Sequence, residues 1–426
     1  MNAVGQGGAD REGVPEVSGT EGRIGRYYTL PGRRPTRTVM CGGIPVGGGA
    51  PVSIQSMTNT DTRDVKATAS QVAALAAAGC DIVRCAVPDE SAAVALKGIR
   101  AELAARGVRV PLVADIHFDH RLAIAAIENG ADKIRINPGN IGGDDRLRAV
   151  VERARAAGVP IRVGVNGGSI EKDIAAEYGG PTAEALAESA LRNIDRVASG
   201  GFEDIVVSVK SSDVRVCGET LHLLSERTDF PLHLGVTEAG VGDRALVKSA
   251  VGIGALLEDG IGDTIRVSLT GDPLREIYSA RDILASVGLL PGAIDVISCP
   301  TCGRCKIDLP RIAEAVWEAV SEIETERVVA ERRESFAECA ELYRRDKARE
   351  YRPGQESFTV AVMGCAVNGP GEASRADIGV ACGNGVAVLF KEGVKIATFA
   401  DSDIVPRLIA EVSDTLGSPG GSIASS

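Results

Sequence analysis

The sequence has few aromatic residues and no long hydrophobic run. Aromatic side chains make up 3% of the 426 residues, with one tryptophan, so there is little surface on which nucleic-acid bases could stack. No apolar stretch reaches the roughly 18 residues of a membrane-spanning helix. A net charge of −11 also argues against a general nucleic-acid footprint, although a local basic pocket remains compatible with it. We expect neither a membrane nor a nucleic-acid partner.

A secretory signal is also missing. Residues 1–36 are rich in Gly, Arg and Glu and lack an apolar core, so we expect a disordered leader and a cytoplasmic, reducing location. In that setting, the ten cysteines are better explained by buried thiols and a metal or redox site than by disulfides. We expect residues 416–426 to be a flexible tail.

Short β-branched runs alternate with alanine-rich segments of helical period. After a predicted small hairpin, eight such runs cover residues 52–58, 82–87, 111–118, 133–139, 161–166, 204–210, 232–238 and 264–270. Eight strand and helix units in about 240 residues match the size of a (β/α)₈ TIM barrel. The sequence therefore predicts an α/β fold with this barrel over residues 37–290.

The pattern changes after residue 290. Glycine-punctuated strands and two amphipathic helices predict a smaller α+β domain over residues 291–415. Residues 325–356 are dense in charges of both signs, so we expect a solvated helix or a partly disordered insertion there.

Five of the eight predicted strands carry a cation near their C-terminal end. Catalytic and binding groups of such barrels gather at these ends, and cations among apolar strand residues are poorly explained as surface decoration. Arginine forks and a lysine together suit a small substrate with several phosphate oxygens. The cations are Arg84, Arg135, Arg162, Lys210 and Arg266, and Asn166 and Ser268 lie at the same ends.

Two other residues at these ends could take part in proton transfer or in binding. Glu238 follows the seventh run and is the best acid/base candidate, the alternative being an ion pair that orients an arginine. His117 is better explained as a hydrogen-bonding pocket residue than as a zinc ligand, since the chain has only four histidines.

Four cysteines of the second domain have the spacing of a metal site. Cys299, Cys302 and Cys305 lie in SCPTCGRC, and Cys365 lies in MGC. The second CxxC motif that a zinc ribbon would have is missing. Spacing therefore favours an iron–sulfur cluster over zinc. Glu372 follows a glycine-rich turn, and spacing alone leaves Cys305 and Glu372 open as the fourth ligand.

Several motifs together resemble the bacterial 4-hydroxy-3-methylbut-2-enyl diphosphate synthase family of the non-mevalonate isoprenoid pathway. They are VSIQSMTNTDTRD, KIRINPGN, IRVGVNGGS, GVTEAG, SCPTCGR and GCAVNGPGEA, and the likeness extends from about residue 36 to 415. The resemblance implies one [4Fe–4S] cluster per subunit, held by Cys299, Cys302, Cys365 and Glu372. Cys305 then lies outside the ligand set.

The same resemblance implies the reaction and its partners. The family opens the ring of 2-C-methyl-D-erythritol 2,4-cyclodiphosphate reductively and removes a hydroxyl, with electrons from reduced flavodoxin or ferredoxin. It works as a homodimer. By resemblance Glu238 handles protons and Glu372 is both ligand and catalytic residue. The implied substrate contacts are Arg84, Arg135, Arg162, Asn166, Lys210, Arg266 and Ser268.

Two segments depart from the family pattern, namely the leader and the charged insertion at 325–356. An alternative hypothesis is a zinc-stabilised barrel enzyme that acts on a phosphorylated small molecule without electron transfer. That enzyme would turn over without any electron donor, which separates the two hypotheses.

Overall fold

The computed structural model describes residues 32–345, 358–383 and 385–417. Most of the expected leader, part of the charged segment and most of the expected tail lie outside these residues. Among the described helices, none is long and apolar enough to cross a membrane.

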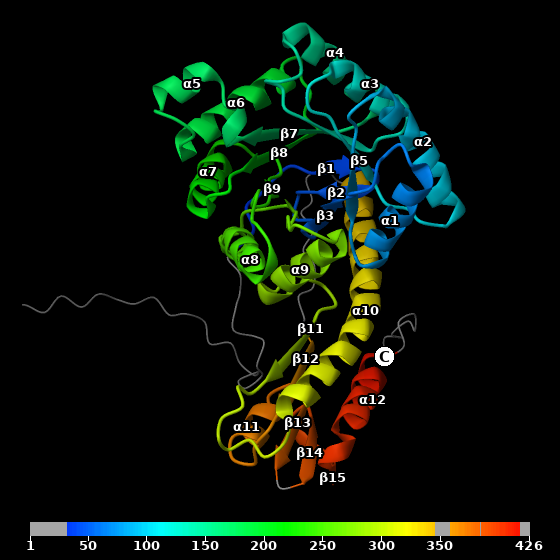
Figure 1. Ribbon diagram of the computed structural model, residues 1–426, viewed down its shortest axis with the longest axis vertical. Coiled ribbons are helices and arrows are strands. Elements are labelled where there is room, and N and C mark those ends of the chain that lie inside the picture. The colour runs from blue at the N-terminus through cyan, green and yellow to red at the C-terminus, as the bar shows by residue number, and fades with distance from the viewer. Residues whose placement is uncertain (1–31, 346–357, 384, 418–426) are drawn as a thin grey trace, which may run out of the picture.

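Eight parallel strands form a closed barrel (Figure 1). In space the order is β8-β7-β6-β5-β4-β3-β10-β9. A bridge between Val207 of β8 and Leu232, the residue before β9, joins the first and last strands of this order. The predicted (β/α)₈ barrel is therefore confirmed. Its strands are β3 (Ser53–Met57), β4 (Ile82–Ala86), β5 (Leu112–Asp115), β6 (Lys133–Ile136), β7 (Ile161–Asn166), β8 (Ile205–Lys210), β9 (His233–Leu234) and β10 (Thr264–Ile265).

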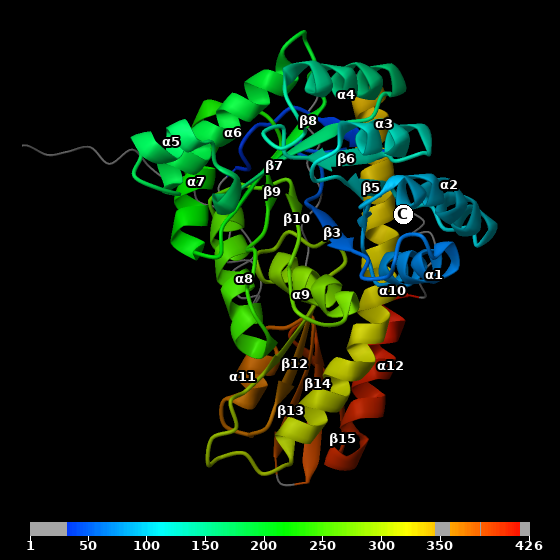
Figure 2. The same cartoon turned by 45° about the horizontal axis from the view of Figure 1, so that its top comes forward.

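Helices surround the barrel (Figure 2). Aspartates begin several of them: Asp64 accepts a hydrogen bond from the backbone of Ala67, and Asp89 accepts one from Ala92. Gly158 ends one helix in the left-handed conformation, φ 63°. The helices are α1 (Val65–Ala77), α2 (Glu90–Ala105), α3 (His120–Glu128), α4 (Asp144–Ala157), α5 (Lys172–Glu177), α6 (Ala183–Ala198), α7 (Val214–Arg227), α8 (Gly242–Glu258) and α9 (Pro273–Ser286).

A hairpin closes the N-terminal end of the barrel. Its strands β1 (Val39–Cys41) and β2 (Ile44–Val46) pair antiparallel, as the sequence predicted. Their apolar side chains form a small separate core with the first inward-facing residues of three barrel strands, Ile82, Val113 and Val206. The open end of the barrel is therefore the one at the C-terminal ends of the strands.

A five-stranded sheet forms the smaller domain. Its order is β11-β12-β13-β14-β15, the first three strands being parallel and the last two pairs antiparallel. One face packs against α10 and α12, and the short α11 lies on the other. The elements are β11 (Ile294–Ser298), α10 (Leu309–Arg345), β12 (Phe358–Met363), α11 (Gly369–Ala373), β13 (Ile378–Gly383), β14 (Val386–Lys391), β15 (Val394–Ala400) and α12 (Ile404–Leu416).

The charged segment 325–356 is helical and buried on one side over the part that the structure describes, and its other side is exposed. Residues 325–345 are the C-terminal half of α10, which runs from the smaller domain up alongside the barrel (Figure 1). Val328 belongs to the barrel core, and Phe336 and Cys339 are also buried. The expected helix is present, but one face of it packs against the barrel, which charge density alone does not indicate. Residues 346–357 lie outside the described part.

Candidate active site

The interior of the barrel is polar. Along β6, Ile134 and Ile136 pack against the helices, so the alternating Lys133 and Arg135 face the interior. The same alternation directs Arg84 and Arg162 inward from their own strands. All four residues are buried, each with less than one tenth of its surface exposed.

One carboxylate lies among these cations. Asp115, at the end of β5, is 4.0 Å from Nε of Arg84 and 3.3 Å from Nη1 of Arg135. Nε2 of His117 lies 3.3 Å from the same carboxylate. Burial alone would raise the pKa of Asp115, but Arg84, His117 and Arg135 together hold it below its ordinary value. Asp115 therefore stays ionised and neutralises only part of the positive charge.

Arg162 has no such partner among the described residues. Its side chain is 1% exposed, and its Nε and Nη1 atoms make no hydrogen bond to the described protein. Burial, with Arg84 and Arg135 nearby, lowers the pKa of Arg162 well below its ordinary value. Burial and the neighbouring arginines lower the pKa of Lys210 in the same way. Such an excess of buried cations fits an anionic ligand.

Two glycines make room for these side chains. A Cβ on Gly164 of β7 would lie 2.7 Å from Nε of Arg135. A Cβ on Gly235, just after β9, would lie 2.8 Å from Nζ of Lys210. Any larger residue at either position would push a cation aside. These positions were not identified as part of the site from the sequence, although glycine inside a strand run is the signal that could have found them.

The last two barrel strands are shorter than predicted. β9 and β10 contain two residues each, so Glu238, Arg266 and Ser268 lie in the following loops. Arg266 is 3.3 Å from the Glu276 carboxylate of α9, which also accepts a 2.8 Å bond from Ser56. Glu276 was missed because only the tertiary structure brings its helix to the end of β10.

Glu238 and Asn166 complete the predicted residues on the barrel. Glu238 is exposed and has a φ of 53°, which is uncommon for a residue other than glycine and stores backbone strain. Asn166 ends β7 and is exposed. Both therefore lie on the open side, above the buried cations.

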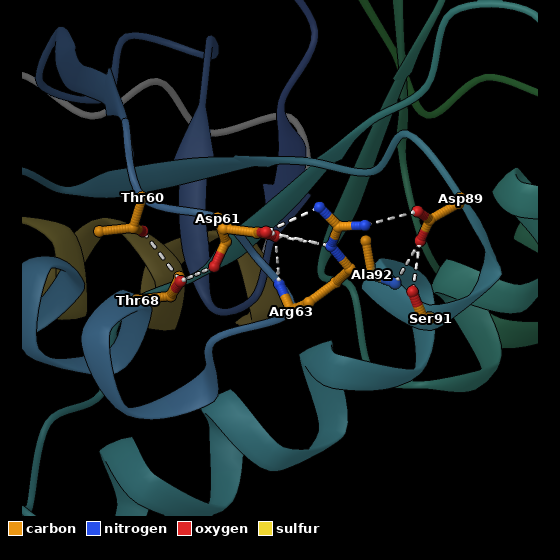
Figure 3. Close-up of polar contacts among 7 residues, drawn as sticks. All are labelled: Thr60, Asp61, Arg63, Thr68, Asp89, Ser91 and Ala92. Atoms are coloured by element: carbon orange, nitrogen blue, oxygen red, sulfur yellow. Dashed lines mark hydrogen bonds and ion pairs between the residues drawn. The ribbon is translucent and has the colours of Figure 1, made fainter.

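Arg63 ties together the loops that follow β3 and β4 (Figure 3). Its guanidinium lies 2.7 Å from Asp61 in its own loop and 3.3 Å from Asp89, the N-cap of α2. A bond of 2.9 Å between the hydroxyls of Thr60 and Thr68 holds the first loop to α1. These contacts fix part of the rim of the open end.

Two of the predicted ligands follow adjacent parallel strands. Cys299 comes directly after β11, and Cys365 comes two residues after β12, with Ser298 paired to Val362. Backbone N–H groups of residues 367–369 lower the pKa of Cys365, and Arg304 lowers that of exposed Cys302. Both thiols are thus biased toward the thiolate that binds iron.

Glu372 and Cys305 differ in their surroundings. Glu372 lies on α11 and is half-buried. Cys305 packs against the apolar core of the smaller domain, where a Cβ on Gly364 would be 2.6 Å from its Sγ atom. No three Cys, His, Asp or Glu side chains in the described residues converge on one metal ion. A cluster does not need such convergence, because each of its ligands binds a different iron.

Sequence models of one family match most of the chain. The GcpE TIM-barrel domain matches residues 36–281, and the GcpE protein C-terminal domain matches residues 332–414. The chain belongs to the GcpE family. The second match begins at residue 332, inside the charged segment, where the structure has the C-terminal half of α10.

Curated GcpE relatives share nearly half of their residues with this chain. The protein of Caldanaerobacter subterraneus subsp. tengcongensis is 48% identical, over 89% of this chain and 97% of its own. That of Clostridium perfringens is 49% identical, over 88% and 98%. Both are named 4-hydroxy-3-methylbut-2-en-1-yl diphosphate synthase (flavodoxin). A solved dihydropteroate synthase from Xanthomonas albilineans has 16% identity over 60% of this chain and all of its own, with a TM-score of 0.42, too low to support an argument.

Proposed function

We infer that this protein is an iron–sulfur oxidoreductase that makes 4-hydroxy-3-methylbut-2-enyl diphosphate from 2-C-methyl-D-erythritol 2,4-cyclodiphosphate. The reaction takes up two electrons and two protons, opens the ring, and releases one oxygen as water. The observation that carries the inference is the group of buried, incompletely paired cations in the barrel. The names of the curated relatives support the product.

The barrel cations bind the diphosphate. Two unpaired Arg162 nitrogens and the depressed pKa values of Arg162 and Lys210 support this role, since phosphate oxygens would replace the lost hydration. Asp115 holds two of the arginines in place without cancelling their charge. The proposed substrate contacts are Arg84, Arg135, Arg162, Asn166, Lys210, Arg266 and Ser268.

Cys299, Cys302, Cys365 and Glu372 would hold one [4Fe–4S] cluster per subunit. The lowered pKa values of Cys302 and Cys365 and the neighbouring strand ends support this ligand set. Cys305 is left out on the family resemblance, because packing against the core does not separate it from Cys299, which packs there as well. The cluster would pass on, one at a time, the two electrons that the reaction consumes. Glu372, as the oxygen ligand, also serves as a catalytic residue.

Glu238 handles a proton. Its exposed position on the loop after β9 and its left-handed backbone place a carboxyl beside the open end of the barrel. Strained backbone of this kind occurs often at functional sites, which supports a catalytic role. The leaving oxygen needs one proton to depart as water, and a carboxyl can donate it.

We also propose a homodimer in which the iron–sulfur domain of one subunit closes over the barrel of the other. In support, α10 contacts its own barrel at Asp81 and Val52, before the strands β4 and β3 begin. The iron–sulfur domain is thus attached at the end away from the diphosphate site. Reduced flavodoxin or ferredoxin would supply electrons, and the ten free thiols suit a reducing cytoplasm.

Anaerobic purification tests the function. We expect brown protein with about four irons per chain and turnover that requires a reductant. Glu372→Ala should lose activity and alter the cluster spectrum, whereas Cys305→Ala should keep both. Colourless protein with stoichiometric zinc, active without an electron donor, would support the zinc alternative, which the comparisons do not favour.

A further inference from the structure

Exposed cations gather around the proposed ligand segments. Residues 299–311 and 364–377 contain five exposed charged side chains, and Asp308 forms a 3.5 Å ion pair with Arg311. The other three are Arg304, Lys306 and Arg375. None of the three forms an ion pair within the described chain, so the exposed side chains of this region carry an excess of positive charge on a protein of net charge −11, with Glu372 and Asp377 half-buried in the same segments.

These cations lie next to the proposed ligands. The backbone N–H of Lys306 donates to Gly364, adjacent to Cys365, at 3.3 Å. The N–H of Arg375 donates to Glu372 at 3.2 Å. Nε of Arg304 is 3.5 Å from Sγ of Cys302. The charges therefore frame the segments through which electrons must enter.

An exposed apolar residue belongs to the same surface. Val367 follows Cys365 by two residues and is 69% exposed. Cys302 is also exposed. An apolar centre with a charged surround is the usual composition of a protein–protein contact. We call the surface formed by Arg304, Lys306, Val367 and Arg375 the cationic face.

We propose that the cationic face is the docking surface for an acidic electron-carrier protein, which binds there while the iron–sulfur domain is not closed over the barrel of the other subunit. The inference rests on the proposed function, because only a reductive enzyme needs such a carrier. Positive charge around the entry point attracts a carrier whose redox group is ringed by carboxylates and speeds its encounter. Each docked carrier loses one electron and is oxidised, so two encounters supply the two electrons of the reaction. The cations proposed to bind the substrate are different ones, inside the barrel.

Charge reversal with two electron donors of opposite charge tests this docking. The variant Lys306→Glu/Arg375→Glu leaves the proposed ligands and Arg304 in place. With reduced flavodoxin, an acidic carrier, we expect KM for the carrier to rise about tenfold at low ionic strength, with a weaker salt dependence. With reduced methyl viologen, a small cation, the rate should be unchanged or higher.

A matched reversal in the same domain serves as the control. Lys395 lies on β15, three strands from β12, and Arg407 lies on α12 across the sheet from α11 (Figure 1). Lys395→Glu/Arg407→Glu should leave the KM for flavodoxin and the rate with methyl viologen unchanged.

An unchanged flavodoxin KM in the test variant would overturn the docking surface. Equal losses with both donors would instead assign these cations to contact with a second copy. Failure of wild type with methyl viologen would count against the proposed function itself.

Discussion

At the scale of single residues, the barrel site depends on charge that the protein leaves incompletely neutralised. Arg162 is 1% exposed and has no carboxylate partner among the residues that the structure describes, while Asp115 is shared by Arg84 and Arg135. A buried cation without a partner destabilises the fold, and an anionic ligand removes that cost. The barrel interior is thus suited to an anionic ligand at the expense of stability of the free protein.

Arg162→Met should therefore stabilise the ligand-free protein, by about 1–3 kcal/mol, because an apolar side chain replaces an unpaired buried charge. Inorganic pyrophosphate should raise the melting temperature of the wild type but not of this variant. Differential scanning calorimetry measures both effects. Arg148→Met, at a side chain 68% exposed on α4, is the control and should change neither. A lower melting temperature for Arg162→Met without ligand would mean that Arg162 has a partner.

The thiol of Cys302 gives a prediction about pH. The backbone N–H of Arg304 and, to a lesser extent, its guanidinium lower the pKa of Cys302, so the thiolate forms at a lower pH than for an ordinary cysteine. In protein stripped of metal, iodoacetamide should modify Cys302 ahead of the buried cysteines at neutral pH. Arg304→Met should move the midpoint of the pH–rate profile upward, as mass spectrometry of the modified peptide would show. An unmoved midpoint would mean that the guanidinium of Arg304 does not stabilise the thiolate.

At the scale of elements, α10 joins the two domains. Arg281 of α9 lies 3.0 Å from Glu324 of α10, and the same carboxylate accepts a 3.1 Å bond from the N–H of Ile294 at the start of β11. One turn past the core residue Val328, Arg332 binds Asp81 and donates at 2.8 Å to the carbonyl of Val52. The helix therefore holds barrel, connection and smaller domain together.

Arg332→Met should destabilise the protein by about 3–5 kcal/mol, because it leaves the Asp81 carboxylate buried without its cation. The neighbouring Arg333 is exposed, and Arg333→Met should be nearly neutral. Chemical denaturation followed by circular dichroism compares the two variants. If both behave like the wild type, the contact of α10 with the barrel is not formed in solution.

At the scale of the whole molecule, the two halves of the proposed site lie far apart in one chain. The buried cations face the open end of the barrel, while α10 attaches the iron–sulfur domain near Asp81 at the other end. A second subunit can bring an iron–sulfur domain to the open end if the protomers pair head to tail about a two-fold axis.

Mixed dimers test that arrangement. A chain with Arg162→Met would lack a working copy of the proposed diphosphate site, and a chain with Cys365→Ala would lack the proposed cluster. Heterodimers purified through two different tags should regain about half of the wild-type activity, since one of their two composite sites is intact. Each variant homodimer, the control, should be inactive. Inactive heterodimers, or a failure to recover any, would contradict a site shared between subunits.

The sequence by itself determined the barrel and the face of each strand residue. Strand side chains alternate with period two, so Ile134 and Arg135 had to face opposite ways once their run formed a strand. The cations at the strand ends, and the cysteines after two later strands, could therefore be identified from spacing. Family resemblance, and not spacing, separated Cys305 from Glu372.

Only the tertiary structure decided the rest. Arg332 and Asp81 are 251 residues apart, and no local pattern indicates that a charged helix will bury one arginine against a distant turn. Glu276 reaches Arg266 only because α9 folds back onto the barrel. The last two strands are short because pairing with neighbours, and not β-propensity, determines where a strand ends. The alternation of side chains along a strand is a local property of the sequence. Ion pairing and strand length instead depend on residues that only folding brings together.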